Sequence, residues 1–282
     1  MKKTKLLIFI VAYNAEKTIQ SVINRIPKKL SKVYNLEVLI IDDCSQDRTF
    51  EISKKIKKNK KLGFQFNILY NPKNQGYGGN QKIGYHYAIK KKFDYVVLLH
   101  GDGQYAPEEL PKLMSGLEKN KYDVVMGSRM INKKNALKGG MPFYKLVGNI
   151  VLTKVQNFLL NTKLAEFHTG YRIYSIKSLR NVPFHLNTQD FHFDTEILIQ
   201  LFLINAKIKE ISIPTFYGDE ICHVNGIKYA FDVVKTTSTA VLQDKFNLKL
   251  ANKYKKNTKI KKIYKNHDID KLLVKAKKRI WF

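Results

Sequence analysis

Short apolar runs alternate with amphipathic stretches of helical spacing over the first 126 residues. The apolar runs have the length of strands and are rich in Val, Ile and Leu, and they lie at residues 5–11, 37–41, 64–70, 94–99 and 123–126. Four segments between them, residues 15–26, 48–61, 78–92 and 107–119, have the spacing of amphipathic helices. This alternation predicts an α/β fold, with a mainly parallel sheet and helices on both of its faces.

The pattern loosens after residue 127. Helices are expected at residues 143–160, 193–203 and 226–246, and short strands at 169–174 and 208–213. We expect one domain over residues 1–248 and a Lys-rich tail over residues 249–282, which carries 13 Lys or Arg and two Asp. Apolar residues separate the lysines of this tail, which suits peripheral contact with an anionic membrane surface. A solvated tail and a partner-binding helix are the alternatives.

The net charge of +28 raises the question of a nucleic-acid partner. Only six of the 51 cationic residues are Arg, the residue best suited to bidentate contacts with phosphates and base edges. No nucleic-acid-binding motif is present either, so we expect no nucleic-acid partner. The apolar run near the N-terminus is too short to span a membrane and is interpreted as a buried first strand. Two cysteines favour a reducing compartment, so the expected location is the cytoplasm or the cytoplasmic face of the membrane.

Polar or glycine-rich residues follow four of the predicted strands, at positions 12–14, 42–43, 74–79 and 100–104. The carboxyl ends of parallel strands meet at one edge of a sheet, where ligands bind in such folds. We therefore expect a ligand crevice at this edge.

The fourth of these positions carries a carboxylate on a turn. Asp102 lies between Gly101 and Gly103, where the backbone can approach a ligand closely. Mg²⁺ and Mn²⁺ prefer oxygen ligands, typically one or two carboxylates together with substrate phosphates. Asp102 suits that role, with Gln104 as a second oxygen donor. An aspartate that only stabilises the turn is the alternative.

Two other strand ends suit a nucleotide. Asp42 and Asp43 are placed to accept hydrogen bonds from a ribose or a base, although a role in capping the next helix is the alternative. Residues 74–80 are glycine-rich and open a helix, so their amides suit a phosphate. They do not form a Walker loop or a Gly-x-Gly-x-x-Gly fingerprint.

The ordered series of motifs resembles family-2 inverting glycosyltransferases of the GT-A fold. The resemblance rests on residues 11–16 (VAYNAE), 38–49 (VLIIDDCSQDRT), 74–84, 101–104 (GDGQ), 127–129 (GSR) and 169–172 (TGYR), and it covers residues 4–235. Within that family, the chain is most similar to the dolichyl- and polyprenyl-phosphate sugar transferases. Two departures are His100, where the first Asp of an Asp-x-Asp metal motif is usual, and Val11 with Ala15, which replace Pro and Glu.

The resemblance implies roles for individual residues. Asp102 would bind Mg²⁺ or Mn²⁺ with Gln104, and Arg129 and Arg172 would contact the acceptor or the diphosphate. The residues implied in binding the nucleotide-sugar are Ala12, Tyr13, Asn14, Glu16, Asp42, Asp43, Gly76, Gly79, Asn80, Lys82, Gly101 and Gly103.

The implied reaction is metal-dependent transfer of a sugar from a nucleotide-sugar to a polyprenyl-phosphate-type lipid. A phosphate acceptor is already anionic and needs no strong base, whereas a hydroxyl acceptor needs one within hydrogen-bond reach. Asp190, Asp194 and Glu196 are the candidate bases, and for Asp194 a helix cap or a buried structural carboxylate is the alternative. Glycosylation of a saccharide hydroxyl for surface glycans and non-catalytic nucleotide-sugar binding are the other functions considered.

Overall fold

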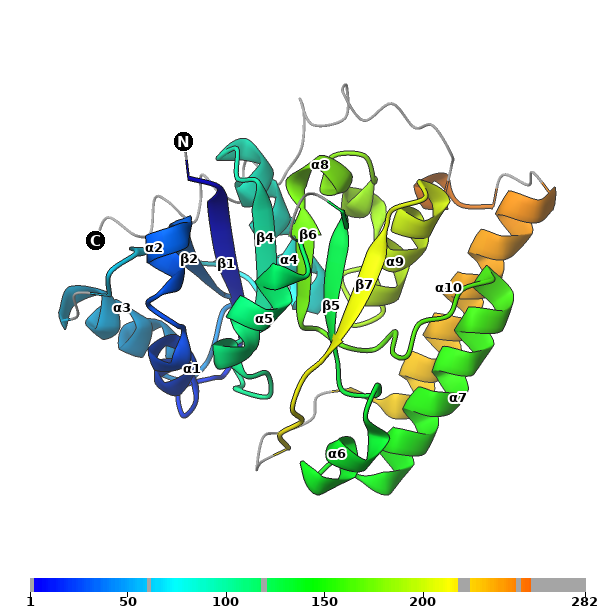
Figure 1. The fold of residues 1–282 in the computed structure, drawn as a ribbon, viewed down its shortest axis with the longest axis horizontal. Coiled ribbons are helices and arrows are strands. Elements are labelled where there is room, and N and C mark those ends of the chain that lie inside the picture. Colours follow the sequence, from blue (N-terminus) through cyan, green and yellow to red (C-terminus); the bar gives the residue numbers. More distant parts are fainter. Residues whose placement is uncertain (1–2, 60–61, 118–120, 218–223, 247–249, 255–282) are drawn as a thin grey trace.

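A computed structural model of the protein describes residues 3–59, 62–117, 121–217, 224–246 and 250–254. Seven strands form one sheet in the order β3-β2-β1-β4-β6-β5-β7 (Figure 1). They are β1 (Lys5–Ala12), β2 (Asn35–Asp42), β3 (Gln65–Tyr70), β4 (Tyr95–His100), β5 (Val124–Ser128), β6 (Arg172–Ser175) and β7 (Ile208–Ser212). All neighbouring pairs are parallel except those of β6, which is antiparallel to β4 and β5. The predicted α/β fold with a mainly parallel sheet is confirmed.

Helices cover both faces of the sheet (Figure 1). The α-helices are α1 (Ile19–Arg25), α2 (Leu30–Val33), α3 (Thr49–Asn59), α4 (Gly76–Lys90), α5 (Leu110–Ser115), α6 (Lys133–Lys138), α7 (Phe143–Leu160), α8 (Ile176–Leu179), α9 (Phe193–Leu203) and α10 (Gly226–Phe246). Short 3₁₀ turns are η1 (Pro107–Glu109), η3 (Phe184–Leu186) and η4 (Asn252–Tyr254).

The alternation of side chains along β1 divides the core into two layers. Leu6, Ile8 and Ile10 pack with residues of α1, α3 and α5 on one face. Leu7 and Phe9 pack with residues of α4 and α9 on the other. This period of two is the reason why a continuous apolar run marks a strand that is covered on both faces.

Several predicted boundaries shift for local reasons. The first helix begins at Ile19 rather than Ala15, and the amide of Ala15 donates to the Thr49 hydroxyl, 2.7 Å away. The helix predicted over residues 107–119 is divided into η1 and α5. The strand predicted from residue 169 begins at Arg172. The short helices α2, α6 and α8 were not predicted.

Most of the predicted tail lies outside the described residues. Residues 250–254, which are described, pack on α9, where Tyr254 is buried and Lys253 forms an ion pair with Glu196. The domain boundary at residue 248 and the membrane role of the tail therefore stay predictions. Among the described helices, none has both the length and the apolar character needed to cross a bilayer.

Candidate active site

The strand ends that the sequence analysis selected meet at one edge of the sheet. The amide of Asp43 donates to the carbonyl of Ala12 across 2.8 Å, which joins the ends of β1 and β2. The amide of Gly101 donates to the carbonyl of Val11 across 2.9 Å, which joins the ends of β1 and β4. The expected crevice residues after β1, β2 and β4 are thus neighbours.

The segment after β1 is held by the segment after β2. Asn14 adopts a left-handed conformation with φ of 49°, and its side-chain oxygen accepts from the Gln46 amide across 2.9 Å. Glu16 pairs with Arg48 at 3.2 Å, so its carboxylate is engaged at the rim of the site. The Tyr13 side chain is 42% exposed at this edge, beside the buried backbone of Ala12.

Asp42 is fully buried at the end of β2 and only half of its carboxylate is satisfied. Oδ1 accepts from the Ser45 amide across 2.8 Å, while Oδ2 is buried without a hydrogen-bond partner among the described residues. Burial raises the pKa of Asp42 to about 6. An unsatisfied buried acceptor costs on the order of 1–3 kcal/mol. A ligand that donates a hydrogen bond to Oδ2, such as a ribose hydroxyl or a base N–H, would remove that cost.

The carboxylate of Asp43 accepts hydrogen bonds from other residues of the protein. Its Oδ1 accepts from the side chain of Asn71 across 2.7 Å and from the amide of Gln75 across 2.9 Å. These bonds hold the loop that leads into α4. Burial raises the pKa of Asp43, although the hydrogen bonds oppose this shift.

The glycine-rich start of α4 packs against another segment of the protein and does not form an open phosphate site. The Gly78 amide donates to the carbonyl of Gln189 across 2.8 Å. A Cβ at Gly76 would lie 2.6 Å from that carbonyl oxygen, and one at Gly78 would lie 2.5 Å from the carbonyl oxygen of Thr188. The glycines therefore allow residues 188–190 to pack on α4. The amides of Gln75, Gly76 and Gly78 all donate to protein oxygens, which does not favour the predicted contact of this segment with a phosphate.

The neighbouring predicted residues are also engaged by the protein. A Cβ at Gly79 would lie 2.8 Å from Cβ of Gln75, so this glycine permits close packing within the turn. The Asn80 side chain donates to the carbonyl of Ile41 across 3.0 Å. Lys82 donates to the carbonyl of Asn187, and burial lowers its pKa to about 8. The Oδ1 atom of Asn80 is buried without a hydrogen-bond partner among the described residues.

Asp102 lies in the crevice with a nitrogen donor beside it. Its Oδ1 accepts from the Gln104 amide across 3.0 Å, and its Oδ2 lies 3.8 Å from Nδ1 of His100. The Asp102 side chain is 39% exposed. Burial raises its pKa, but the contacts with His100 and the Gln104 amide outweigh that effect and lower it overall. Gly103, with φ of 83°, forms the turn. An accessible carboxylate beside an imidazole nitrogen fits a divalent ion.

A chain of polar contacts leads from this site into the interior. His100 Nε2 lies 3.0 Å from the hydroxyl of Tyr77, and that hydroxyl donates to Oδ2 of Asp194 across 2.8 Å. Oδ1 of Asp194 lies 3.7 Å from the Arg172 guanidinium. The carboxylate of Asp194 therefore orients Tyr77 from behind and does not face the crevice.

The structure corrects the prediction for Arg172. Its side chain is fully buried and donates to four protein oxygens: the carbonyls of Phe167, Thr169 and Asp194 and the hydroxyl of Tyr174. A phosphate cannot reach a guanidinium that is enclosed in this way. Arg172 joins the start of β6 to α9 and holds Asp194.

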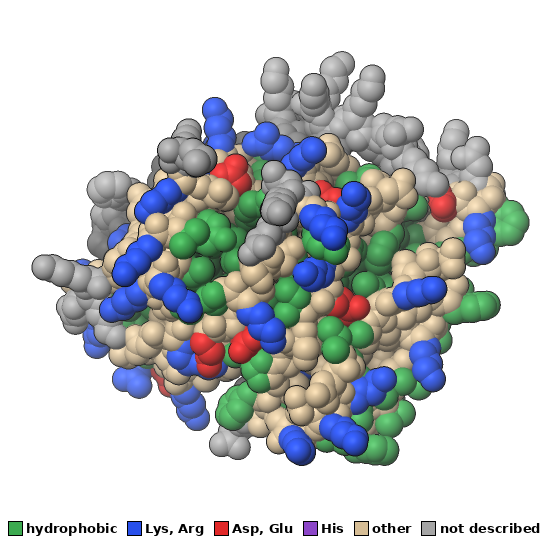
Figure 2. Space-filling model, viewed as in Figure 1, with side chains coloured by type: hydrophobic (Ala, Val, Ile, Leu, Met, Phe, Trp, Pro, Cys, Tyr) green, Lys and Arg blue, Asp and Glu red, His purple; other side chains and the backbone are tan. Residues whose placement is uncertain are grey.

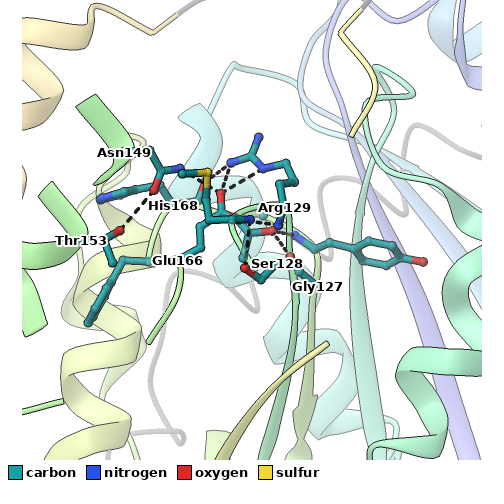
Figure 3. A network of polar contacts seen from close by, with 12 residues as sticks. Gly127, Ser128, Arg129, Asn149, Thr153, Glu166 and His168 are labelled. Carbon is teal, nitrogen blue, oxygen red and sulfur yellow. Dashed lines mark hydrogen bonds and ion pairs between the residues drawn. The ribbon is translucent and has the colours of Figure 1, made fainter. Parts of the chain in front are cut away.

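Arg129 is likewise committed to the protein, as Figure 3 shows. Its Nε donates to the buried carboxylate of Glu166 across 2.9 Å, and Nη2 forms an ion pair with the same oxygen. Other N–H groups donate to the Tyr217 hydroxyl at 3.1 Å and the His168 carbonyl at 2.9 Å. The predicted contact of Arg129 with phosphate is not supported, because Glu166 neutralises its charge inside the protein.

The other two candidate bases are engaged as well. Asp190 pairs with Lys228 at 2.7 Å. Glu196 is fully buried, accepts from the Thr188 amide across 2.6 Å and pairs with Lys253.

Asp190 also belongs to a cluster with His192 and Asp232, whose donor atoms are close enough to share an ion. The Lys228 ammonium contacts both carboxylates, at 2.7 and 3.0 Å. This cluster therefore already contains a cation.

Sequence reasoning missed three residues that organise the site. Tyr77 lies in the segment that attracted attention for its glycines, Glu166 lies in a stretch without periodicity, and Gly170 had no role beyond its motif. A Cβ at Gly170 would overlap the ring of His100, so only glycine leaves room for it. Of these, Tyr77 and Gly170 lay in segments that the sequence analysis had selected, residues 74–80 and 169–172, whereas no signal pointed to Glu166.

Comparisons with known proteins agree with this arrangement. The profile of Glycosyl transferase family 2 matches residues 7–182. The UDP-N-acetylglucosamine–dolichyl-phosphate N-acetylglucosaminyltransferase of Methanococcus voltae is 28% identical over 226 residues, covering 76% of this chain and 87% of that protein. The dolichyl-phosphate hexose transferase of Haloferax volcanii is 30% identical over 202 residues, covering 72% and 78%.

The fold is also found among solved structures. Glucosyl-3-phosphoglycerate synthase from Mycobacterium tuberculosis, in complex with Mn²⁺, uridine diphosphate and glucosyl-3-phosphoglycerate, superposes with a TM-score of 0.57 at 15% identity. The match covers 87% of this chain and 81% of that one. The GT-A fold is thereby confirmed.

The buried Asp42 predicts a specific pH dependence. A folded-state pKa of about 6, above the ordinary value of 3.8, means that stability is full below pH 4 and is lost as the pH rises through 6. In urea denaturation, the free energy of unfolding of the wild type should fall by about 2–3 kcal/mol relative to Asp42→Asn between pH 4 and 7.

Asp47→Asn is the matched control. Burial raises the pKa of Asp47, but hydrogen bonds from Thr49 and the Glu16 amide lower it overall, so its difference from the wild type should be flat above about pH 4. A flat difference for Asp42→Asn as well would contradict the interpretation of its buried carboxylate.

Proposed function

Because the chain belongs to glycosyl transferase family 2, and is therefore a glycosyltransferase, we propose that it transfers a sugar from a nucleotide-sugar to a polyprenyl-phosphate-type lipid, with inversion. The names of the relatives from Methanococcus voltae and Haloferax volcanii support a dolichyl-phosphate acceptor. The residues at the carboxyl ends of the strands also support this reaction.

The donor nucleotide would lie at the ends of β1 and β2. Tyr13 offers an exposed aromatic ring there, and Asp42 offers a buried carboxylate oxygen that lacks a donor. A nucleoside has both a ring to stack and hydrogen-bond donors to give. Asn14 and Glu16 would shape the rim of this pocket, since both are held to the segment after β2.

The diphosphate would lie toward Asp102. This carboxylate would hold a Mg²⁺ or Mn²⁺ ion together with phosphate oxygens of the donor, as hard cations are usually held. Such an ion supplies a Lewis acid that neutralises charge on the departing diphosphate. The turn at Gly101 and Gly103 keeps the backbone close to that position, and a metal contact by Gln104 stays a prediction.

The observation that carries the acceptor class is that each of the three candidate bases is already engaged. Asp194 accepts from Tyr77 and Gln81, Asp190 pairs with Lys228, and Glu196 is buried with Lys253. A hydroxyl acceptor would need a base within hydrogen-bond reach in order to lose its proton. A lipid phosphate attacks as an anion and needs none, so it fits these residues better than a saccharide does.

The two arginines have positioning roles in this proposal. Arg129 lies 5.8 Å from the ring centre of Tyr105, whose hydroxyl accepts from the Gly170 amide across 2.6 Å. Arg172 holds Asp194, which in turn orients Tyr77. Both arginines support the crevice wall without touching the substrate.

A lipid acceptor requires a surface that meets the membrane, and the exposed side chains of α7 and α10 would suit this role. Gln156 of α7 lies 3.5 Å from Thr237 of α10, so the two helices pack together (Figure 1). Both expose large apolar side chains to solvent; they are Phe143, Tyr144, Val147, Val151, Phe158, Ile227, Phe231, Leu242 and Phe246. We name this set the α7–α10 face.

Exposed lysines lie among these apolar residues; they are Lys154, Lys235 and Lys245. Figure 2 shows green and blue side chains together over this part of the molecule. Exposed apolar groups beside cations match an anionic bilayer, which takes up the apolar groups and attracts the charges. We therefore assign peripheral membrane contact to the α7–α10 face.

The proposed reaction is tested by a matrix of donors and acceptors. Release of nucleoside diphosphate from UDP- and GDP-sugars should require polyprenyl phosphate and should stop when EDTA removes divalent ions. Asp102→Asn should lower the rate on the order of 10²–10³-fold, whereas Glu51→Gln, an exposed change on α3, should leave it unchanged. Turnover only with saccharide acceptors, or no turnover with any donor, would contradict the proposal.

The membrane contact is tested by vesicle flotation. The double variant Phe158→Glu, Phe231→Glu removes two apolar side chains from the α7–α10 face and should weaken binding to anionic vesicles at least about tenfold. Val33→Glu is the matched control, because Val33 is 61% exposed but lies on α2. Equal flotation of both variants would overturn this assignment, as would a change in oligomeric state of the double variant without lipid.

A further inference from the structure

His100 occupies the position next to Asp102 where an oxygen ligand is usual in this family, and its surroundings define which of its nitrogens faces the crevice. The hydroxyl of Tyr77 lies between two partners, Oδ2 of Asp194 at 2.8 Å and Nε2 of His100 at 3.0 Å. A tyrosine hydroxyl has a single hydrogen to donate. The protonation of the two partners therefore decides the direction of both contacts.

Asp194 is the acceptor of that hydrogen. Its other oxygen accepts from the Gln81 side chain across 3.1 Å and lies 3.7 Å from the Arg172 guanidinium. The Gln81 amide and the Arg172 guanidinium, which is always charged in proteins, are both donor groups, so Asp194 is an acceptor here. The hydrogen of Tyr77 therefore points toward Oδ2 of Asp194.

It follows that Nε2 of His100 donates to Tyr77. The hydroxyl oxygen has lone pairs left after its hydrogen is used, and only an N–H on Nε2 makes a favourable contact with it. The opposite ring nitrogen, Nδ1, then faces Asp102, whose Oδ2 is 3.8 Å away. Two ligand atoms bound to one ion at about 2.1 Å lie about 3.0–4.2 Å apart, so this separation suits a shared ion.

The imidazole is held in this orientation by packing as well. Tyr105 meets it edge to face at 5.0 Å between ring centres, and Tyr77 does so at 5.4 Å. Gly170 provides the space on the side of Nε2, where any Cβ would overlap the ring. The ring is 15% exposed, and this exposure lies beside the accessible Asp102.

We propose that Nδ1 of His100 is a ligand of the divalent ion at Asp102, so that the site is a mixed nitrogen and oxygen site that favours Mn²⁺ over Mg²⁺. Imidazole suits transition metals, whereas Mg²⁺ prefers oxygen. A histidine ligand usually donates its other N–H to a fixed acceptor, which Tyr77 provides here. The inference rests on the proposed function only in that the diphosphate of the donor completes the coordination.

Electron spin-echo spectroscopy of Mn²⁺ tests the nitrogen ligand directly. In the full chain with Mn²⁺ and UDP or GDP, the spectrum should contain modulation from a directly bound ¹⁴N, and His100→Asp should abolish that modulation while Mn²⁺ stays bound. Calorimetry should show that His100→Asp lowers the preference for Mn²⁺ over Mg²⁺ on the order of tenfold. Bound Mn²⁺ without ¹⁴N modulation in the wild type, or an unchanged preference in the variant, would overturn the proposal.

A second variant tests the orientation of the ring. Tyr77→Phe removes the acceptor of Nε2–H and should weaken Mn²⁺ binding about 10–100-fold, with no comparable loss for Tyr122→Phe, a change at a partly exposed tyrosine. Thermal unfolding establishes that both variants fold. Equal Mn²⁺ affinity of folded Tyr77→Phe and wild type would contradict the role of Tyr77.

Transfer to polyprenyl phosphate is measured separately. If the protein transfers the sugar but its bound Mn²⁺ shows no ¹⁴N modulation, only the proposal that His100 is a metal ligand is overturned. If the modulation is present but no sugar is transferred, only the proposed function is overturned.

Discussion

The buried ion pair between Arg172 and Asp194 is the constraint on which the rest of the site depends. It joins the start of β6 to α9, and its contacts satisfy a guanidinium that has no access to water. Breaking such a pair leaves an uncompensated charge in the interior and costs about 3–5 kcal/mol. Its negative partner directs the hydroxyl of Tyr77, and Tyr77 directs His100 toward the crevice. The buried carboxylate of Asp194 thus determines which nitrogen of His100 faces the crevice.

A second buried pair, Arg129 with Glu166, contacts Tyr105 and Tyr217 through its guanidinium. Both guanidinium groups are thus occupied by protein groups, and in the proposed function they position the site without binding the acceptor. In the proposed membrane contact, the positive charge that would meet anionic lipid lies instead on the α7–α10 face, where lysines lie among exposed apolar residues. In the proposed function, Arg129 and Arg172 position residues at the catalytic edge of the sheet, and the lysines of the α7–α10 face contact the membrane.

Much of the fold could be predicted from the sequence, because the spacing of apolar residues along the chain indicates which side chains are buried. The run at 5–11 predicted β1 to within one residue, and 143–160 predicted α7 to its ends. The contacts within the site were harder to predict from the sequence. A sequence displays the charge of Arg172 but not the carbonyls that surround it, and it does not bring Tyr77, His100 and Asp194 together. The glycines at 76 and 78 suggested phosphate, yet they make room for residues 188–190, which lie more than a hundred positions away.

The central claim is that Tyr77 donates to Asp194 and accepts from Nε2 of His100. Nitrogen NMR of the chain labelled with ¹⁵N-histidine measures this directly, with His100→Asp to assign the resonance. We predict that Nε2 of His100 carries a proton and that its signal shifts in Tyr77→Phe. A neutral His100 ring protonated at Nδ1 alone would contradict it.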